Sequence, residues 1–291
     1  MGEKDITEKL LADYNDVFAD IVNVLLFNGK RLVKEEELKN TKDKSQYKAD
    51  GGIHEQERDL SKIWQNCNLK ISMIGMENQT DIDEYMPLRI IGYDGAAYRS
   101  QYEATKTVAY PVVTIILHFG NKKWEKPRCL SDIMSVPEVM QPYFQDYGIN
   151  VFNIPYLSAE QVDMFQSDFK IVADYFVQMR IDPEHYKPSQ QTITHVDAIL
   201  KLMSVLTGDS RYEEAVNSLK GKKGGVTMCN AMESAELKGR TEGRAEGRLE
   251  ERKQVVTNAL KKGKSVAEVA DLLGLAEEEV KAIQDEVCSM A

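Results

Sequence analysis

The chain has 291 residues, 42% of them hydrophobic and 29% charged, and its formal net charge at pH 7 is −10. This length and apolar fraction allow a sizeable core, in a principal domain with helical additions. The acidic balance argues against a protein that coats nucleic acid over its whole surface. Contact with phosphate at a single cleft remains compatible with it, because a basic rim and a bound metal offset the repulsion there.

No stretch of the sequence predicts a membrane anchor or a secretory leader. It contains no run of about 18 uncharged apolar residues, and its first residues, MGEKDITEKL, are polar and acidic. The cysteines are far apart, with no CxxC pair, so we expect reduced structural thiols in a cytoplasmic protein. They are Cys67, Cys129, Cys229 and Cys288.

The N-terminal region predicts a helix followed by less regular chain. Residues 6–27 carry apolar side chains at spacings of three and four, which indicates an amphipathic helix closed by Asn28 and Gly29. Residues 30–38 favour a short strand. Residues 39–57 are polar and contain glycine, so they favour a loop.

Two strands are expected next, over residues 58–64 and 69–77, and they form a plausible hairpin. Side chains two positions apart in a strand share a face, so Glu77 and Gln79 emerge side by side at the end of an apolar run. The hairpin brings Asp59 towards Glu77 if the register is right. A carboxylate at the end of a buried strand needs a partner, either a divalent metal or a nearby Arg or Lys.

A long helix follows these strands. Thr80 is a candidate N-cap, and the helical pattern covers residues 81–104, with aspartates suited to the first turn. The positions that stand at the spacing of a core face are Tyr85, Leu88, Ile91 and Gly92.

The next apolar stretch, residues 111–119, reads PVVTIILHF and predicts a strand that is buried on both faces. Trp124 and Pro127 fit a loop that covers the sheet. Residues 149–157 predict one more strand.

From residue 158 onwards the pattern is helical. Ser158 and Gln161 form a capping box that opens a helix through Met179, and further helices are expected over residues 192–206 and 209–220. The order of elements predicts an α/β fold with a helical C-terminal part.

The C-terminal tail repeats every four residues over 238–253, with one row each of glycine, arginine and glutamate. Paired copies of this segment bring arginine rows against glutamate rows, which favours a homo-oligomer; a charged spacer explains the pattern equally well. Residues 264–291 predict a helical hairpin with a capping box at Ser265 and a stop at Gly274. The predicted domains are residues 1–157, 158–230, 231–263 and 264–291.

Four stretches together resemble a known family. They are Arg58-Asp59, the run MENQTDIDEYMPLRIIGYD, the strand PVVTIILHFG with Trp124 and Pro127, and the tail KGRTEGRAEGR. On these residues the sequence resembles the PD-(D/E)XK nuclease superfamily and, more narrowly, the bacterial recombination-promoting nucleases (Rpn, YhgA-like transposases). The resemblance implies a PD-(D/E)XK-type mixed sheet flanked by helices, with a helical C-terminal extension, and a Mg²⁺-dependent DNA endonuclease.

The resemblance also implies roles for individual residues. The catalytic set is Asp59, Glu77 and Gln79. The ligands for Mg²⁺, which Mn²⁺ can replace, are Asp59, Glu77 and the backbone carbonyl of Asn78. Asp20 is the candidate acid from the first helix, although a solvated helix face explains it as well. The candidate contacts to the DNA backbone are Arg58, Arg89 and Gln101.

One position departs from the superfamily pattern. Gln79 stands where a lysine is expected, so the positive charge usually placed beside the attacking water is missing. The alternative to an active nuclease is therefore a nuclease fold with a decayed site, which serves as a DNA-binding or assembly module.

Overall fold

The structure is a computed structural model that describes residues 9–41, 44–49, 52–57, 59–66, 69–103, 108–219, 225–231, 233 and 251–289. The chain forms two compact units, Met1–Ala231 and Met232–Ala291. Arg58, Cys67 and most of the repeat at 238–253 lie outside the described residues. Cys129 and Cys229 are free thiols, as expected.

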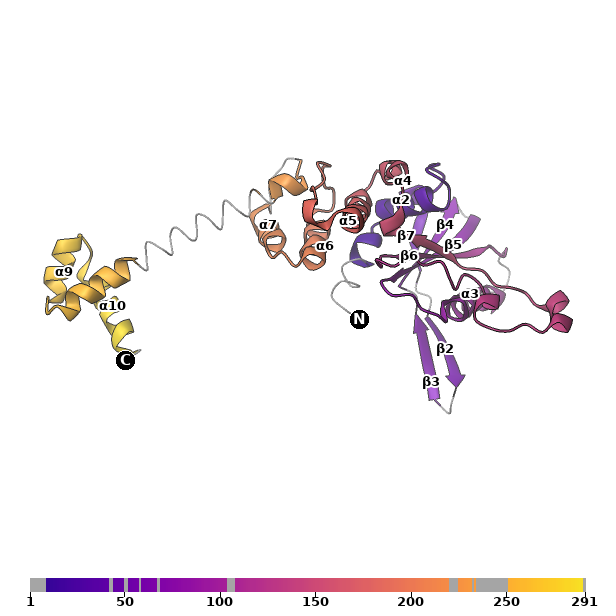
Figure 1. Cartoon of the computed structure of the whole chain (residues 1–291), viewed down its shortest axis with the longest axis horizontal. Coiled ribbons are helices and arrows are strands. Elements are labelled where there is room, and N and C mark those ends of the chain that lie inside the picture. Colours follow the sequence, from indigo (N-terminus) through magenta and orange to yellow (C-terminus); the bar gives the residue numbers. More distant parts are fainter. Residues whose placement is uncertain are drawn as a thin grey trace. The chain divides into compact units, whose positions relative to one another are not determined.

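The first unit is built on a five-stranded mixed sheet in the order β1-β4-β5-β6-β7 (Figure 1). The strands are β1 (Leu38–Asn40), β4 (Leu60–Asn66), β5 (Leu69–Gln79), β6 (Val112–His118) and β7 (Asn150–Asn153). β4 runs antiparallel to both of its neighbours, β1 and β5, whereas β5, β6 and β7 are parallel to one another. The expected hairpin and the expected mixed sheet flanked by helices are both present.

Helices cover both faces of this sheet (Figure 1). One face carries α3 (Met86–Glu103), which packs its Met86, Ile90 and Tyr93 against Ile116 of β6 and the wholly buried Trp124. The other face carries the helical residues 9–12, α2 (Asn15–Leu25) and α5 (Phe169–Ile181). The strands are therefore apolar on both sides, as the sequence of β6 predicts.

The face of α3 that is buried differs from the predicted one. The predicted core positions are exposed: Tyr85 by 65%, Leu88 by 46% and Ile91 by 36%, and Gly92 is exposed as well. The helix instead buries a neighbouring face, which includes Met86, Ile90, Tyr93, Asp94 and Ala97. The helix also begins at Met86 and not near Thr80, because residues 80–83 form a loop in which Asp83 accepts a hydrogen bond from the Tyr85 amide.

The N-terminal region differs from the prediction in its first helix, its first strand and its expected loop. The first helix breaks at residues 13–14, and its end is closed as expected by Asn28 and Gly29, both with positive φ. The strand expected over residues 30–38 begins only at Leu38. The expected loop over residues 39–57 contains a second, two-stranded sheet of β2 (Lys44–Ala49) and β3 (Gly52–Glu57), which projects from the main sheet in Figure 1.

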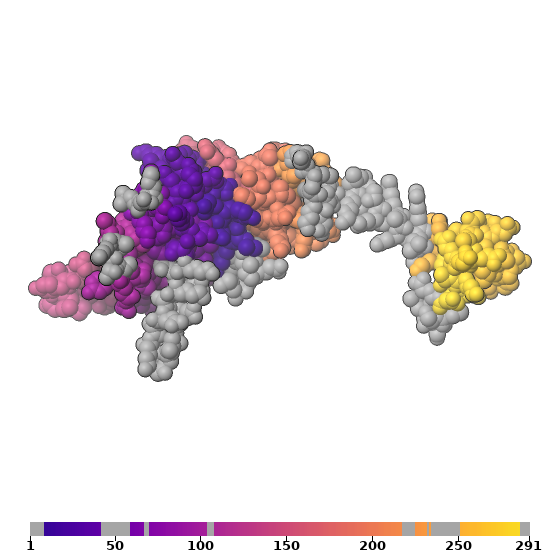
Figure 2. Space-filling model, turned by 180° about the vertical axis from the view of Figure 1, so that it is seen from behind, coloured from indigo at the N-terminus to yellow at the C-terminus, as the bar shows by residue number. Residues whose placement is uncertain are grey.

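Helices complete the first unit. The capping box at Ser158 and Gln161 is confirmed, but its helix is short: α4 (Ala159–Met164) ends before α5 begins at Phe169. The two later helices are α6 (Val196–Thr207) and α7 (Arg211–Leu219), close to their predicted ranges. The expected strand over 149–157 ends at Asn153, where a 3₁₀ turn follows (Ile154–Tyr156). A loop with the 3₁₀ helix Glu138–Tyr143 protrudes from the body of the unit in Figure 2.

The second unit is a small helical bundle. Its described helices are residues 251–261, α9 (Val266–Leu273) and α10 (Glu277–Ser289), around a core that includes Val256, Val269 and Val280. The capping box of Ser265 with Glu268 and the left-handed Gly274 are both as predicted. Among the described helices of the whole chain, none is both long and apolar enough to cross a membrane.

Candidate functional site

The two predicted carboxylates meet at the end of the β4–β5 hairpin. Leu60 pairs with Met76, which places Asp59 beside Glu77. The Asp59 amide donates to Glu77 Oε1 at 3.0 Å, and the Asn78 amide donates to Asp59 Oδ2 at 3.0 Å. Each carboxylate is thus fixed by the backbone of the other strand, so the hairpin itself sets the geometry of the pair.

Two cations complete the environment of these carboxylates. The ammonium of Lys9 lies 2.6 Å from Asp59 Oδ1, and Arg89 Nη2 of α3 lies 2.8 Å from Glu77 Oε2. The Glu77 side chain is 0% exposed, and an isolated charge at such a depth is strongly disfavoured. Lys9 and Arg89 therefore place a positive charge beside each carboxylate and offset the cost of its burial.

Tyr93, one turn along α3, holds Arg89 in place. Its hydroxyl accepts a hydrogen bond of 3.0 Å from Arg89 Nε, and the guanidinium lies 5.7 Å from the centre of its ring. Burial, followed by the negative charge of Glu77, raises the pKa of Tyr93 above its usual value. For Arg89, burial lowers the pKa, but Glu77 and Tyr93 outweigh it and the net shift is upward. Arg89 is thus a permanent cation and Tyr93 a neutral phenol.

The oxygens at this site are of the kind that Mg²⁺ binds. Mg²⁺ is often held by only one or two carboxylates, with water and substrate phosphate completing its shell. Asp59 and Glu77 supply two, and the Asn78 carbonyl points towards the same strand edge as its amide, which contacts Asp59. Among the described residues, however, no group of three or more Asp, Glu, His or Cys side chains could hold a metal. A metal here must therefore rely on these two acids, and it competes with Lys9 and Arg89 for their oxygens.

The Asn78 side chain points away from the carboxylates. In a strand it lies on the face opposite Glu77, where it lines a small apolar cavity with Leu11 and Phe169. Its buried Oδ1 has no hydrogen-bond partner among the residues that the structure describes. If Asn78 binds a metal, it does so through its backbone only, as the sequence analysis expects.

Asp20 has other partners. One of its oxygens pairs with Arg31, and the other accepts hydrogen bonds from the amides of Gln166 at 2.8 Å and Ser167 at 2.7 Å. These amides belong to the break between α4 and α5. The contacts of Asp20 thus explain why the predicted single helix is interrupted, and they give this acid a structural task away from Asp59 and Glu77.

The remaining predicted residues lie in different places. Gln79 follows Glu77 on the same face, half-buried, and its backbone carbonyl accepts from the Phe119 amide. Gln101 lies near the far end of α3, where its amide group binds both the N–H and the C=O of Tyr110. Arg89 contacts Glu77 instead of standing open to a ligand. Arg58 lies outside the described residues.

Two lysines near this region, Lys9 and Lys62, were not predicted from the sequence, and each has a partner far along the chain. Lys9 binds Asp59, and Lys62 of β4 is 1% exposed with its ammonium 2.7 Å from the Asp13 carbonyl. Burial lowers the pKa of Lys62, although Asp13 opposes the shift. No local pattern marks Lys9, because its partner is far along the chain; Lys62 is detectable as a charge within an apolar strand.

His118, at the end of β6, is a further buried polar residue close to the site. It pairs with Gln79 in the sheet, is 1% exposed, and its Nδ1 lies 3.0 Å from Asn153 Oδ1. The Asn153 amide is oriented by the backbone of Trp124, whose N–H donates to Oδ1, so Nδ1 of His118 must be the donor. Burial lowers the pKa of His118, against the hydrogen bonds to Asn153 and the Thr80 backbone.

We expect acid to destabilise the first unit through His118. Its pKa is lower in the folded protein than in the unfolded chain, so protons favour unfolding as the pH falls below the ordinary value of about 6.5. The side chain in His118→Asn keeps a donor for Asn153 but cannot be protonated. The free energy of unfolding of this variant should therefore fall less between pH 7 and pH 5 than that of the wild type. Urea unfolding followed by tryptophan fluorescence measures this. An unchanged pH dependence would contradict it, and His185→Asn, at an exposed position, is the control.

Gly120, just after β6, permits the close contact between the two strand ends. A Cβ atom there would lie 2.2 Å from the Thr80 carbonyl oxygen and 2.6 Å from His118 Nε2. Gly120→Ala should therefore lower the free energy of unfolding by about 1–3 kcal/mol, the usual cost of overpacking. Gly95→Ala is the matched control, since its Cβ meets nothing within 4 Å and it should be neutral or slightly stabilising. Equal urea midpoints for the two variants would refute the steric argument.

Comparison with known proteins identifies the family. Residues 72–201 match the family described as "Putative transposase, YhgA-like". The matched part runs from β5 with Glu77 into α6, and this match supports the family expected from the sequence. Asp59 lies upstream of the match. No curated protein and no solved structure was found to match the chain. The family indicates a role of the transposase or nuclease type.

Proposed function

We propose that the protein is a metal-dependent DNA endonuclease with a core of the PD-(D/E)XK type. The observation that carries the proposal is the interlocked pair of Asp59 and Glu77 at the open end of the β4–β5 hairpin. Two carboxylates fixed by backbone amides form a rigid pair of acids. Burying such groups costs free energy, and a hydrophobic core does not need them for packing. The family assignment supports the same class of role.

The residues that hold the metal are Asp59, Glu77 and the carbonyl of Asn78, with Mg²⁺ as the ion and Mn²⁺ as a substitute. A divalent ion there supplies an acidic water at neutral pH and offsets charge on the scissile phosphate. Gln79, on the same face as Glu77, orients the attacking water through its amide.

The two cations of the site have a task in this reaction as well. Lys9 and Arg89 neutralise the carboxylates in the free protein. If these oxygens were bound to a metal, Lys9 and Arg89 would be available to the phosphate, whose charge grows in the transition state. Tyr93 keeps the guanidinium on the substrate side of α3 through its hydrogen bond to Nε. In this way the chain provides the positive charge that Gln79 cannot give.

One set of contacts favours the second candidate, a decayed nuclease that acts as a DNA-binding or assembly module. All four oxygens of Asp59 and Glu77 already have a protein partner, from Lys9, Arg89 and two backbone amides. Such a closed arrangement also suits an ion-pair network with a purely structural role. The repeat at 238–253, proposed to join copies of the chain, fits either candidate.

Plasmid cleavage separates the two candidates. Purified protein is incubated with supercoiled plasmid and Mg²⁺, Mn²⁺ or EDTA, beside Asp59→Asn and Glu77→Gln. We expect metal-dependent nicking by the wild type and a loss in each variant that exceeds the roughly 10–100-fold typical for outer-shell partners of a metal. Both substitutions keep the size of the side chain, and unfolding in urea shows whether each variant is folded.

A further variant tests whether a failure to cleave DNA is caused by the glutamine at position 79. Gln79→Lys places the expected charge beside Glu77, so a nuclease limited only by this residue should cleave faster. If the wild type and Gln79→Lys both fail to nick DNA with either metal, the endonuclease proposal is wrong and the decayed-site candidate takes its place.

A further inference from the structure

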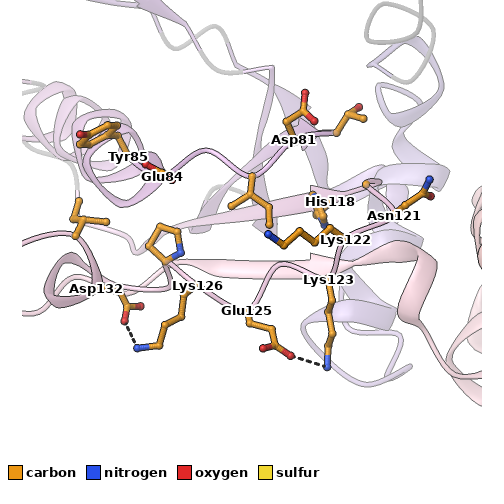
Figure 3. Close-up of a pocket in the computed structure, with 15 residues that line it drawn as sticks. Asp81, Glu84, Tyr85, His118, Asn121, Lys122, Lys123, Glu125, Lys126 and Asp132 are labelled. Atoms are coloured by element: carbon orange, nitrogen blue, oxygen red, sulfur yellow. Dashed lines mark hydrogen bonds and ion pairs between the residues drawn. The ribbon is translucent and has the colours of Figure 1, made fainter.

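A cleft of about 960 Å³ opens beyond the strand end that carries Glu77 and Gln79 (Figure 3). One wall is formed by residues 80–85, which follow β5, and the other by residues 120–127, which follow β6, with His118 among the lining residues. In open α/β sheets, ligands bind outside the carboxyl ends of parallel strands, and β5 and β6 are such a pair. The cleft therefore lies where the fold favours a ligand.

The β6 wall is basic and readily accessible. Lys122, Lys123 and Lys126 all line the cleft. Lys123 is paired with Glu125 at 3.8 Å and Lys126 with Asp132 at 2.7 Å, and both lysines are more than half exposed. The Lys123–Glu125 pair is exposed and contributes little to stability, so the Lys123 ammonium can turn to an incoming phosphate at small cost. Asp132 is only 11% exposed, but the Lys126 ammonium has three donors and can contact a phosphate while it keeps this partner.

Lys122 can contact a phosphate without first leaving an ion-pair partner. Within the described residues it makes no ion pair, and Figure 3 shows its side chain extended into the cleft. The opposite wall carries Asp81 and Glu84, which repel phosphate, and the ring of Tyr85, which is 65% exposed. A bound strand must therefore place its backbone along the lysines, and its bases face the aromatic ring.

We propose that this cleft binds a single strand of DNA, with phosphates on the three lysines and a base stacked on Tyr85. The choice of DNA rests on the proposed function. Pockets of about 300–1,000 Å³ enclose ligands of drug size, so the cleft takes a nucleotide or two of one strand and not a duplex. Lysine phosphate contacts combined with an aromatic platform are the usual means of holding single strands. A strand in the cleft has its backbone beside the segment that follows β6 and its bases beside the segment that follows β5.

The test is a binding titration in EDTA, which prevents metal-dependent cleavage. A short fluorescent oligothymidylate is titrated with the full-length protein and its fluorescence anisotropy is followed at several salt concentrations. The variants are Lys122→Ala and Tyr85→Ala. Each has a matched control: Lys70→Ala, at the other end of β5, and Tyr102→Ala, at the other end of α3 and 90% exposed.

We expect each lysine removed from the cleft to reduce the slope of log affinity against log salt by about 0.7, the value for one phosphate of a single strand. Tyr85→Ala should weaken binding about tenfold without changing the slope, whereas Tyr85→Phe retains the affinity because it keeps the ring. The two controls should bind like the wild type. A duplex of the same length should compete less well than the single strand.

Failure of this inference is distinguishable from failure of the proposed function. Binding that depends on Lys122 and Tyr85, in a protein that never nicks plasmid, supports the cleft and refutes the nuclease. Binding that is equal in cleft variants and controls, or that favours duplex, overturns the cleft even if the wild type cleaves DNA.

Discussion

Arg89→Met should lower the free energy of unfolding of the first unit by about 2–3 kcal/mol. Breaking a buried ion pair by removing one partner usually costs about 3–5 kcal/mol, because the remaining charge is buried and unpaired. Glu77 is 0% exposed, but the Arg89 side chain is 34% exposed, so solvent screens part of the interaction and the lower value applies. Methionine retains much of the apolar stem, which limits the loss to the charge.

Urea unfolding followed by tryptophan fluorescence is well suited to this test. The chain has two tryptophans, Trp64 and Trp124, and both belong to the first unit, so the helical C-terminal unit contributes no signal. The double variant Glu77→Gln with Arg89→Met removes both charges and should recover part of the loss. Arg99→Met, on the exposed side of the same helix, is the matched control and should leave the urea midpoint nearly unchanged. If Arg89→Met is as stable as this control, the ion pair does not hold Glu77 in place.

The pairing of Asp59 with Glu77 could be predicted because its causes are local. The strict alternation of β5 determines the face of Glu77, and a short connection between β4 and β5 brings Asp59 alongside. The α3 face could not be predicted in the same way. Both sides of this helix carry large apolar residues, and only contact with Ile116 and Trp124 selects Met86, Ile90 and Tyr93 for burial.

The partners of the carboxylates were beyond the reach of the sequence for a different reason. Lys9 belongs to the N-terminal helical residues and contacts Asp59, whereas Arg89 belongs to α3 and contacts Glu77. These contacts form only after the two helices have packed on opposite faces of the sheet. No spacing rule connects these positions. The basic wall of the cleft was not predicted because its three lysines, within residues 122–126, are separated by Trp124 and Glu125, so no long run of positive charge marks it.

Divalent metal should bind more tightly once Arg89 is removed. In the wild type, two carboxylates and two cations make the site nearly neutral, so an arriving Mg²⁺ is attracted by the acids and repelled by Lys9 and Arg89. In Arg89→Met the site keeps one net negative charge, and one Glu77 oxygen loses its competitor. A change of only about 1.4 kcal/mol in this repulsion is a tenfold change in affinity, and we expect at least about that.

Thermal unfolding with and without Mg²⁺ measures this without any assay of activity. A ligand that binds only the folded state adds about 2.7 kcal/mol at 100 times its dissociation constant. Mg²⁺ should therefore raise the melting temperature of Arg89→Met more than that of the wild type, EDTA should remove both increases, and Asp59→Asn should show none. Equal shifts in all three proteins would mean that Mg²⁺ binds elsewhere. The metal and Arg89 stabilise the same carboxylate. The stability lost in Arg89→Met should therefore be offset by the stability gained on binding Mg²⁺. An ion-pair network without a metal role does not predict this compensation.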